Sequence, residues 1–164
     1  MKILKVRDVK TPTRGTSLSA GIDFYVPNDF NEVSLNPHDD LLIPSGIKAK
    51  FDENYMLMAA DKSGVSTSKY AAVRADRTPK QDAHYSPTIL GAKIVDADYQ
   101  GEIHIHIINL GNYPIRITPG TKIAQFILVP VNYDVIEEVE TEHDLFNGVS
   151  TERGDGGFGS TGNK

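Results

Sequence analysis

Short apolar runs, each closed within a few residues by glycine, proline or a polar cluster, constrain this chain more than any other feature. In the clearest run, 103–108, Ile103, Ile105 and Ile107 share one face, as the period of a β-strand requires. One weak helical stretch covers 67–75. Many short strands with this punctuation predict an all-β sandwich, barrel or jelly roll. Further strands are expected over 2–9, 22–26, 41–43, 47–51, 55–59, 115–117, 123–131 and 135–139.

Length, charge and cysteine content narrow the class of protein. The chain has 164 residues, the size of one ordinary domain. Its formal net charge of −5 disfavours nonspecific DNA or RNA binding, because a phosphate backbone attracts cations. The absence of cysteine excludes disulfides, thiolate metal sites and cysteine nucleophiles. No apolar run is long enough to span a membrane and no signal-peptide pattern opens the chain, so we expect a cytoplasmic protein without membrane contact.

The C-terminal segment 153–162 has five glycines in ten residues. Composition alone predicts a flexible arm, and a bare disordered end is the simpler alternative. Arg153 can bind phosphate bidentately, and Phe158 can stack on a base. Ser160 and Thr161 add hydroxyl groups beside glycines whose N–H groups can approach a polyphosphate closely. An arm that orders over a nucleotide would need this composition.

Segment 96–101 lies between two predicted strands, and its Asp and Gly residues predict a hairpin turn. A carboxylate on such a turn, Asp96, is suited to act as a general base. Tyr99, in the same turn, offers a flat wall against which a sugar can lie. The structural role as a turn and the catalytic role are compatible.

Segment 61–66 predicts a turn and a helix start, and Lys62 with the neighbouring hydroxyls favours a phosphate site there. Asp23, at a strand start, is suited to hold Mg²⁺ through water, since this ion keeps most of its hydration shell. His104 and His106 have the spacing of a metal pair on one strand face. No third ligand of obvious spacing accompanies them, so we favour a polar strand face or a subunit contact for this pair.

Taken in order, five segments resemble the five motifs of the trimeric dUTP pyrophosphatase (dUTPase) family. They are Ala-Gly-Ile-Asp, Lys-Ser-Gly, Gly-Ala-Lys-Ile-Val-Asp-Ala-Asp-Tyr-Gln-Gly, Pro-Gly-Thr-Lys-Ile-Ala-Gln and the glycine-rich tail. Together they reach over nearly the whole chain, which makes a chance match of all five hard to accept. The segments span 20–23, 62–64, 91–101, 119–125 and 153–162.

The resemblance implies an all-β, jelly-roll-like subunit with a short helix, in which 1–152 form the catalytic domain and 153–164 a flexible Gly-rich arm. It also implies a homotrimer with active sites at subunit interfaces. The implied reaction is hydrolysis of dUTP to dUMP and pyrophosphate, which limits uracil in DNA and supplies dUMP for dTMP synthesis. A bacterial cytoplasm, or that of a phage-infected host, is the expected setting.

Residue roles follow from the resemblance position by position. Asp96 would be the general base for in-line attack of water on the α-phosphorus, with Tyr99 stacked under the deoxyribose. Asp23 would hold waters of a Mg²⁺ bound to the triphosphate. The remaining residues expected to contact substrate are Lys62, Ser63, Gly64, Lys93, Ile94, Gln125, Arg153, Phe158, Gly159, Ser160 and Thr161.

The chain departs from the family pattern in three places. Lys62 and Lys122 stand where arginine is usual, so bidentate contacts become point charges. Lys93 stands at a frequent glycine near the base pocket. The loop over about 71–88 is longer than a connection needs, and we expect a solvated surface loop there, with a lid or a docking surface for a protein partner as alternatives. Some phage members with insertions near this site act as regulatory partners, and that analogy suggests a phage origin.

Two other functions compete with dUTP hydrolysis. A dCTP deaminase resembles dUTPases in fold, and release of ammonia would identify it. A regulatory protein-binding module on a dUTPase scaffold is the second alternative. The near-complete glycine-rich tail favours the pyrophosphatase over the deaminase, while retention of Asp96, Tyr99 and Phe158 argues against an inactive scaffold.

Overall fold

The computed structural model describes residues 1–66 and 86–157. Within these ranges the chain is built from antiparallel β-strands and two short helices, so the prediction of an all-β fold is confirmed. No helix in the described part is long and apolar enough to cross a membrane. The predicted helix over 67–75, most of the 71–88 loop, and Phe158, Gly159, Ser160 and Thr161 lie outside the described residues.

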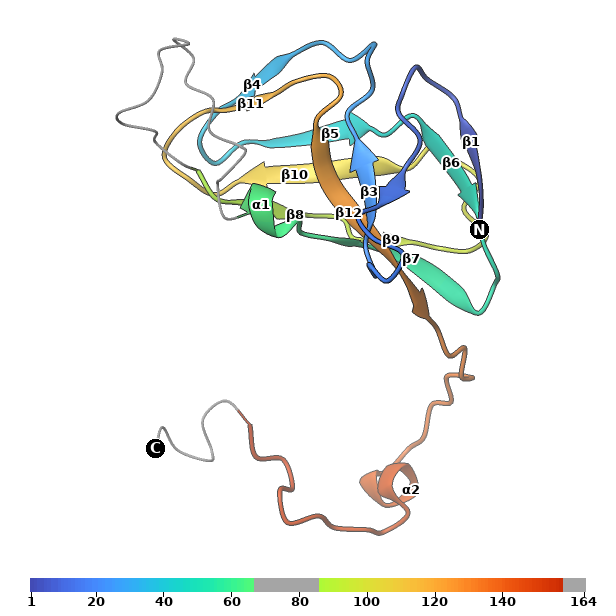
Figure 1. Cartoon of the computed structure of the whole chain (residues 1–164). Helices are drawn as coiled ribbons and strands as arrows, with labels where there is room; N and C mark the ends of the chain where they lie inside the picture. The colour runs from blue at the N-terminus through green and yellow to red at the C-terminus, as the bar shows by residue number, and fades with distance from the viewer. Residues whose placement is uncertain (67–85, 158–164) are drawn as a thin grey trace. The chain divides into compact units, whose positions relative to one another are not determined.

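The largest sheet has five strands in the order β2-β3-β12-β7-β9 (Figure 1). Its long middle strand pairs with β3 on one side and with β7 on the other. This sheet carries four of the five motif segments, or their flanks. The strands are β2 (Thr13–Arg14), β3 (Ile22–Tyr25), β12 (Lys122–Pro130), β7 (Tyr55–Ala60) and β9 (Ile94–Val95).

Three smaller antiparallel sheets complete the β structure, in the orders β5-β10-β8, β1-β6 and β11-β4. The short helix α1 (Ser63–Ser66) follows β7 directly, as the sequence predicts for this segment. The strands are β5 (Asp40–Pro44), β10 (His104–Asn109), β8 (Thr88–Leu90), β1 (Lys2–Lys5), β6 (Ile47–Lys50), β11 (Ile115–Ile117) and β4 (Val33–Leu35).

The core lies between the sheets, and strand alternation builds it. In β10, Ile105 and Ile107 are 1% exposed, while His104 and His106 lie on the opposite face of the strand. Phe24 of β3 and Phe126 of β12 are also fully buried, with ring centroids 4.4 Å apart. Burial of these large side chains supplies the main favourable free energy of folding.

A β-bulge interrupts the pairing of β12 with β3. Lys122 lies opposite Tyr25 and Gln125 lies opposite Asp23, so β12 takes three steps where β3 takes two. The extra residue is Ile123, at the register shift. Because strand side chains alternate faces, Lys122 and Gln125 would otherwise point to opposite sides of the sheet. The bulge brings both to the face that carries Asp23 and Tyr25.

Two sequence predictions about connections are wrong. The segment 135–139 is not a strand: Val135 and Ile136 are more than 90% exposed and have no ladder partner in the described structure. Segment 96–101 contains a turn but does not close a hairpin, because β9 pairs with β7 whereas β10 pairs with β5 and β8. The turn predicted over 96–101 is therefore present, but the chain crosses to another sheet there instead of folding back as a hairpin.

Contacts divide the chain into two compact units, Met1–Asn132 and Tyr133–Lys164. All twelve strands of the described residues lie in the first unit. The second contains the helix α2 (Glu142–Phe146), which the sequence analysis did not predict. Thr141 caps its start by accepting a hydrogen bond from the Asp144 N–H, and Asn147 ends it in the left-handed conformation.

Candidate active site

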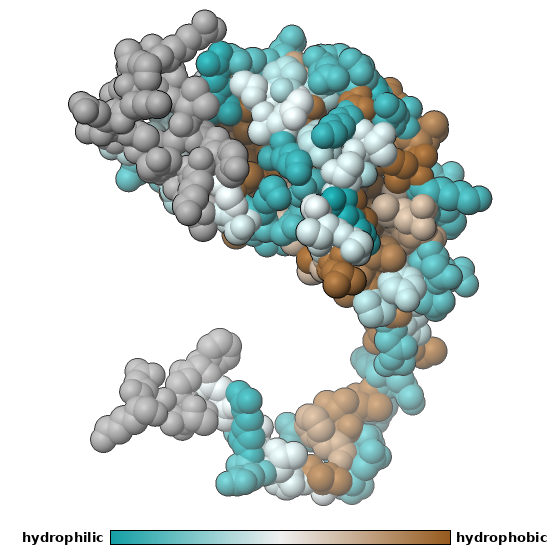
Figure 2. All heavy atoms as spheres, in the orientation of Figure 1, coloured by the Kyte–Doolittle hydropathy of each residue, from teal (hydrophilic) through white to brown (hydrophobic). Residues whose placement is uncertain are grey.

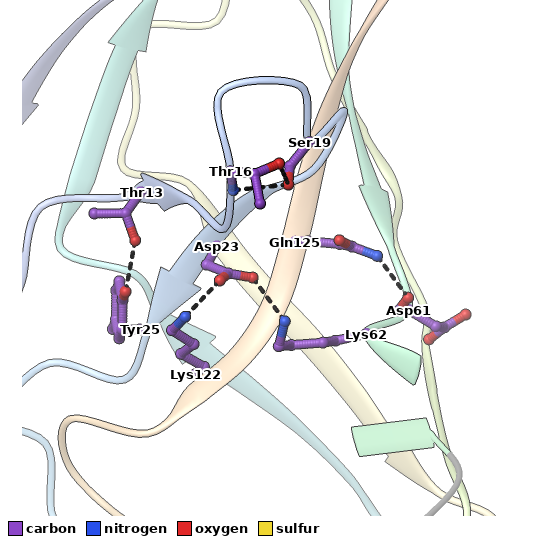
Figure 3. A network of polar contacts seen from close by, with 9 residues as sticks. All are labelled: Thr13, Thr16, Ser19, Asp23, Tyr25, Asp61, Lys62, Lys122 and Gln125. Atoms are coloured by element: carbon purple, nitrogen blue, oxygen red, sulfur yellow. Dashed lines mark hydrogen bonds and ion pairs between the residues drawn. The ribbon is translucent and has the colours of Figure 1, made fainter. Parts of the chain in front are cut away.

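A buried carboxylate with two lysine partners lies at the centre of the site. Asp23 in β3 is 4% exposed. Lys62, just after β7, donates to its Oδ1 over 2.9 Å, and Lys122 in β12 donates to its Oδ2 over 2.7 Å (Figure 3). Three of the predicted motifs thus meet at one side chain.

Electrostatics keep this carboxylate charged. Burial alone would raise the pKa of Asp23, but hydrogen bonds and positive charge from Lys122 and Lys62 outweigh burial and lower it. The hydrogen bond to Asp23 and the negative charge of that carboxylate raise the pKa of Lys122. The cluster carries two ammonium groups for one carboxylate, so its net charge is positive and it favours an anionic ligand.

The aromatic ring of Tyr25 lies beside Lys122 and extends the site. The Lys122 ammonium lies 5.8 Å from the ring centroid, and the Lys10 ammonium lies 4.9 Å from it. The Tyr25 hydroxyl is 2.7 Å from the Thr13 hydroxyl. Burial would raise the pKa of Tyr25, but the Thr13 hydrogen bond and the two lysine charges lower it.

Gln125 extends the site across the sheet. It lies opposite Asp23 on one side and opposite Ala60 on the other, and its Nε2 donates to the Asp61 carbonyl over 3.0 Å. A Cβ on Gly21 would lie 2.1 Å from Gln125 Oε1, so a larger residue there would displace the end of the Gln125 side chain. The glycine of the first motif therefore makes room for the glutamine of the fourth.

Asp61 is a site residue that the sequence analysis missed, because its position looked like an ordinary turn before a helix. Its Oδ1 accepts the Leu90 N–H over 2.7 Å, and its Oδ2 lies 3.6 Å from the Lys93 ammonium. Ser63 and Gly64 follow it in α1. No sequence signal marks a carboxylate whose partner lies about 30 positions away on another element.

The loop after β9 carries the other predicted residues. Asp96 and Tyr99 are exposed, and the Tyr99 N–H donates to the Asp96 carbonyl over 3.2 Å. The Tyr99 hydroxyl donates to the Glu102 carbonyl over 3.0 Å, which fixes the ring. A Cβ on Gly101 would lie 2.2 Å from that hydroxyl oxygen, so the glycine is required by the ring. The loop lines a surface groove of about 480 Å³ with residues 2–4 and 48–50.

The structure brings some predicted residues together and separates others. Lys93 precedes β9 and faces Asp61 near the Asp23 cluster. Asp96 lies three residues further along, which is about 10 Å at the rise of a strand. Ile94, between them, has an exposed side chain. Within one chain, the cationic cluster and the Asp96–Tyr99 loop are therefore distinct parts.

The start of the glycine-rich tail forms a tight turn. The Arg153 Nε donates to the Gly156 carbonyl over 2.9 Å, and the Gly156 N–H donates to the Arg153 carbonyl over 3.0 Å. Gly154 has a φ of 51°, in the left-handed region that glycine adopts freely. Arg153 is exposed, so its guanidinium edge faces solvent.

The donor set of the described residues does not form a metal cage, since no group of three or more His, Asp or Glu side chains is close enough to hold an ion. The two oxygens of Asp23 offer about four lone-pair sites. The lysines occupy one on each oxygen. The remaining lone pairs fit hydrogen bonds from the water shell of Mg²⁺ rather than direct coordination.

An antiparallel β fold with a positively charged strip around one buried carboxylate defines an anion-binding β protein. The dUTPase family model matches residues 75–162, and the chain belongs to the dUTPase family. It is 34% identical to deoxyuridine 5'-triphosphate nucleotidohydrolase of Caldanaerobacter subterraneus, over 99% of this chain and 97% of that protein. It is 33% identical to the enzyme of that name from the Wolbachia of Brugia malayi, over 98% and 90% of the two chains.

Solved structures of similar fold include phage proteins. The dUTPase of Staphylococcus bacteriophage 80alpha with dUPNHPP superposes with a TM-score of 0.75 and 23% identity, over 98% of this chain and 97% of that one. A mutant dUTPase of phage phi11 of S. aureus, described with a structural Mg(II) ion, gives a TM-score of 0.68 and 19% identity over 87% and 97%. At these identities the likeness concerns the fold.

Proposed function

We propose that this chain hydrolyses dUTP to dUMP and pyrophosphate. The observation that carries the proposal is the Asp23 cluster, where Asp23, two lysines and Gln125 bring three motifs together on one face of the sheet. The names of the relatives support dUTP as the substrate and favour hydrolysis over deamination. The reaction belongs to nucleotide metabolism, and we place it in the cytoplasm of a bacterium or of a phage-infected host.

The Asp23 cluster, with Lys62, Lys122 and the neighbouring Gln125, is the proposed phosphate site. Lys62 and Gln125 bind phosphate oxygens as hydrogen-bond donors, together with the hydroxyl of Ser63 and the main chain at Gly64. The positive charge of the cluster offsets the negative charge of the triphosphate. Positioning and charge stabilisation of this kind are the main contributions of a protein to phosphoryl transfer. Asp23 keeps the two lysines in place through their ion pairs.

The loop after β9 is the proposed base and sugar site. Asp96 accepts a proton from the water that attacks the α-phosphorus in line, a role that its exposed carboxylate permits. Tyr99, fixed by its bond to Glu102, packs under the deoxyribose and leaves no room for a 2′-hydroxyl. Lys93 and Ile94 contribute main-chain groups to the uracil edge.

We propose a homotrimer in which different subunits supply these parts to one site. The order and completeness of the five motifs that resemble the trimeric family support this arrangement. Arg153, Phe158, Gly159, Ser160 and Thr161 then come from the C-terminal arm and bind the γ end of the substrate, with Phe158 over the uracil. The roles of the last four are extrapolated from the motif alone.

The fit of the donor set to Mg²⁺ supports a metal that arrives with the substrate. Mg²⁺ bound to the triphosphate would neutralise phosphate charge and hold its geometry. Asp23 accepts hydrogen bonds from the water shell at the lone pairs that the lysines leave open.

Pyrophosphate release with Mg²⁺ from dUTP, dCTP, dTTP and UTP tests the function. We expect release from dUTP alone and a loss of at least about a hundredfold in Asp96→Asn. Asp98→Asn is the matched control, because Asp98 is an exposed carboxylate in the same loop. Ammonia release from dCTP would establish the deaminase instead, and inactivity on every nucleotide would overturn the proposal.

A further inference from the structure

The stretch that leads into β9, residues 90–93, is bound at each residue by a hydrogen bond to a group from another element. Leu90 donates its N–H to Asp61 Oδ1 over 2.7 Å, and the carbonyl of Lys93 accepts the Ala59 N–H over 2.6 Å. This attachment matters because β9 is short. Its ladder with β7 comprises two residue pairs at the edge of the sheet, too few to fix a strand by themselves.

One residue, His106, binds the two residues in the middle of this stretch: its main chain binds Gly91 and its ring binds Ala92. The carbonyl of His106 accepts the Gly91 N–H over 2.8 Å, and its ring Nδ1 lies 3.2 Å from the Ala92 amide nitrogen. The other ring nitrogen, Nε2, lies 2.8 Å from Asp40 Oδ2. A Cβ on Gly91 would lie 2.0 Å from Nδ1, so the ring fits only against glycine.

These contacts determine the tautomer of His106. A main-chain N–H can only donate, so Nδ1 must be the unprotonated acceptor for Ala92. The proton of the neutral ring then lies on Nε2, where it is donated to Asp40. The carboxylate therefore orients the ring and selects the tautomer that can bind the main chain.

His104 provides an internal comparison on the same face of β10. Its Nδ1 lies 2.9 Å from the Glu102 carbonyl, to which it must donate. The carbonyl belongs to a residue two positions away, so this contact is local. The two histidines thus have opposite tautomers, and His106 is the one that reaches the stretch before β9.

We propose that His106, oriented by Asp40, is a positioning residue for the reaction of this site. By holding Gly91 and Ala92, it fixes the chain four positions before Asp96 and so sets where the proposed base lies. The inference rests on the proposed function, since the effect on rate requires Asp96 to be catalytic. The pair was predicted as a polar strand face or a subunit contact, and neither assigns His106 a part in catalysis.

Two substitutions of His106 test the roles of its ring nitrogens Nδ1 and Nε2 separately. The amide oxygen of His106→Asn can occupy the place of Nδ1 and accept the Ala92 N–H, whereas the longer side chain of His106→Gln places its amide near Nε2 and Asp40. We expect His106→Asn to keep kcat within about twofold, and His106→Gln to lower kcat roughly tenfold with a smaller change in KM. His104→Asn is the matched control, because its amide nitrogen can keep the hydrogen bond to the Glu102 carbonyl, and it should leave both constants unchanged.

NMR spectroscopy tests the hydrogen bond between the Ala92 N–H and the His106 ring without relying on activity. In the wild type the ¹⁵N shift of His106 Nδ1 should be that of an unprotonated nitrogen, and the Ala92 amide should exchange slowly with solvent. Exchange at Ala92 should accelerate at least about tenfold in His106→Gln but not in His106→Asn. Thermal unfolding of all three variants excludes general misfolding as the cause of a lost rate.

The outcomes distinguish this inference from the proposed function. An active wild type with equal kcat in His106→Gln and His106→Asn would overturn the positioning role and leave dUTP hydrolysis intact. A protonated Nδ1 in the wild type would overturn it as well. A wild type that hydrolyses no nucleotide would overturn both, whatever the exchange rates at Ala92.

Discussion

Asp23 shows how one residue can link stability to pH. Replacing it by Asn leaves two ammonium groups close together without their carboxylate, so we expect the free energy of unfolding to fall by about 2 kcal/mol at pH 7. Because the folded state lowers the pKa of Asp23, its contribution is present above the unfolded pKa of about 3.9 and is lost as pH falls through the lower folded value.

Urea unfolding at pH 7 and near pH 3 measures this effect. The difference between wild type and Asp23→Asn should shrink at the lower pH. Asp98→Asn, which removes an exposed carboxylate, should stay within about 0.5 kcal/mol of the wild type. A stability difference that is the same at both pH values would contradict the assignment of the lowered pKa to Asp23.

Gly101 controls the ring of Tyr99. The Cβ of Gly101→Ala would lie 2.2 Å from the Tyr99 hydroxyl oxygen and 2.4 Å from the adjacent ring carbon, so the ring must move. We expect KM for dUTP to rise about tenfold, because the wall of the sugar site is displaced. Steady-state kinetics measure it, with Gly15→Ala as a control that meets only Ser19 Oγ at 3.4 Å. Unchanged kinetics in Gly101→Ala would show that the ring does not shape the sugar site.

Sequence patterns locate the glycines of the site, but they do not show why glycine is needed at those positions. The motif resemblance places Gly21 and Gly101 within functional segments, yet the atoms that exclude a Cβ there belong to Gln125 and Tyr99. Gln125 lies across the sheet from the first motif, so this clash depends on strand register. Asp61 was missed for the same reason, since its partners are set by tertiary structure.

Among the elements, β10 depends on a buried amide at its end. Asn109 is 0% exposed, and its Nδ2 donates to the carbonyls of Leu35, Asn36 and Tyr113 over 2.8–3.2 Å. Its Oδ1 accepts the Gly111 N–H over 3.0 Å. One side chain thus joins β10 to the end of β4 and to the connection before β11.

Asn109→Asp keeps the shape of this side chain and removes the donor group. Three carbonyls then face a buried carboxyl, so we expect the free energy of unfolding to fall by about 3 kcal/mol at pH 7. Chemical denaturation followed by circular dichroism measures the loss. Asn112→Asp is a control at an exposed position, where a change below about 0.5 kcal/mol is expected. A stable Asn109→Asp protein would show that the three bonds contribute little.

Strands with clear alternation were predictable, and short or context-dependent ones were not. The isoleucine alternation of β10 and the apolar run of β12 carry their own signals, and both strands lie within two residues of the expected bounds. β2 has two residues and β4 three, which is too short for a period to emerge. The false strand over 135–139 has β-branched residues, but Val135 and Ile136 are exposed and no strand of the described structure pairs with the segment.

At the scale of the whole molecule, we expect the β fold to form without the C-terminal unit. Among the described residues, every member of the buried core lies at or before Phe126, so a chain of residues 1–132 should fold. The proposed γ-phosphate contacts lie beyond residue 152, so the same chain should lose dUTP hydrolysis by at least about a hundredfold. The predicted division between 1–152 and 153–164 concerns activity and stays a prediction.

Circular dichroism and pyrophosphate release test the truncated chain together. A cooperative unfolding transition without hydrolysis is the expected pair of results. Failure to fold would show that residues 133–164 stabilise the β unit, and full activity would remove the arm from the proposed mechanism. The C-terminal unit exposes apolar side chains over α2, with Leu145 and Phe146 each 58% exposed (Figure 2), so the shorter chain should also be the more soluble one.

The bulge in β12 has a consequence for how genes of this kind can vary. Lys122 and Gln125 stand three positions apart and still share a face, because Ile123 is the extra residue of the bulge. An in-frame deletion of the codon for Ile123 would leave every charged residue in the chain and would keep Lys122 on the face of Asp23, but it would remove the bulge together with a buried core side chain. Descendants of this gene should accept a change of cation at position 122 more readily than a change in the number of codons between positions 122 and 125.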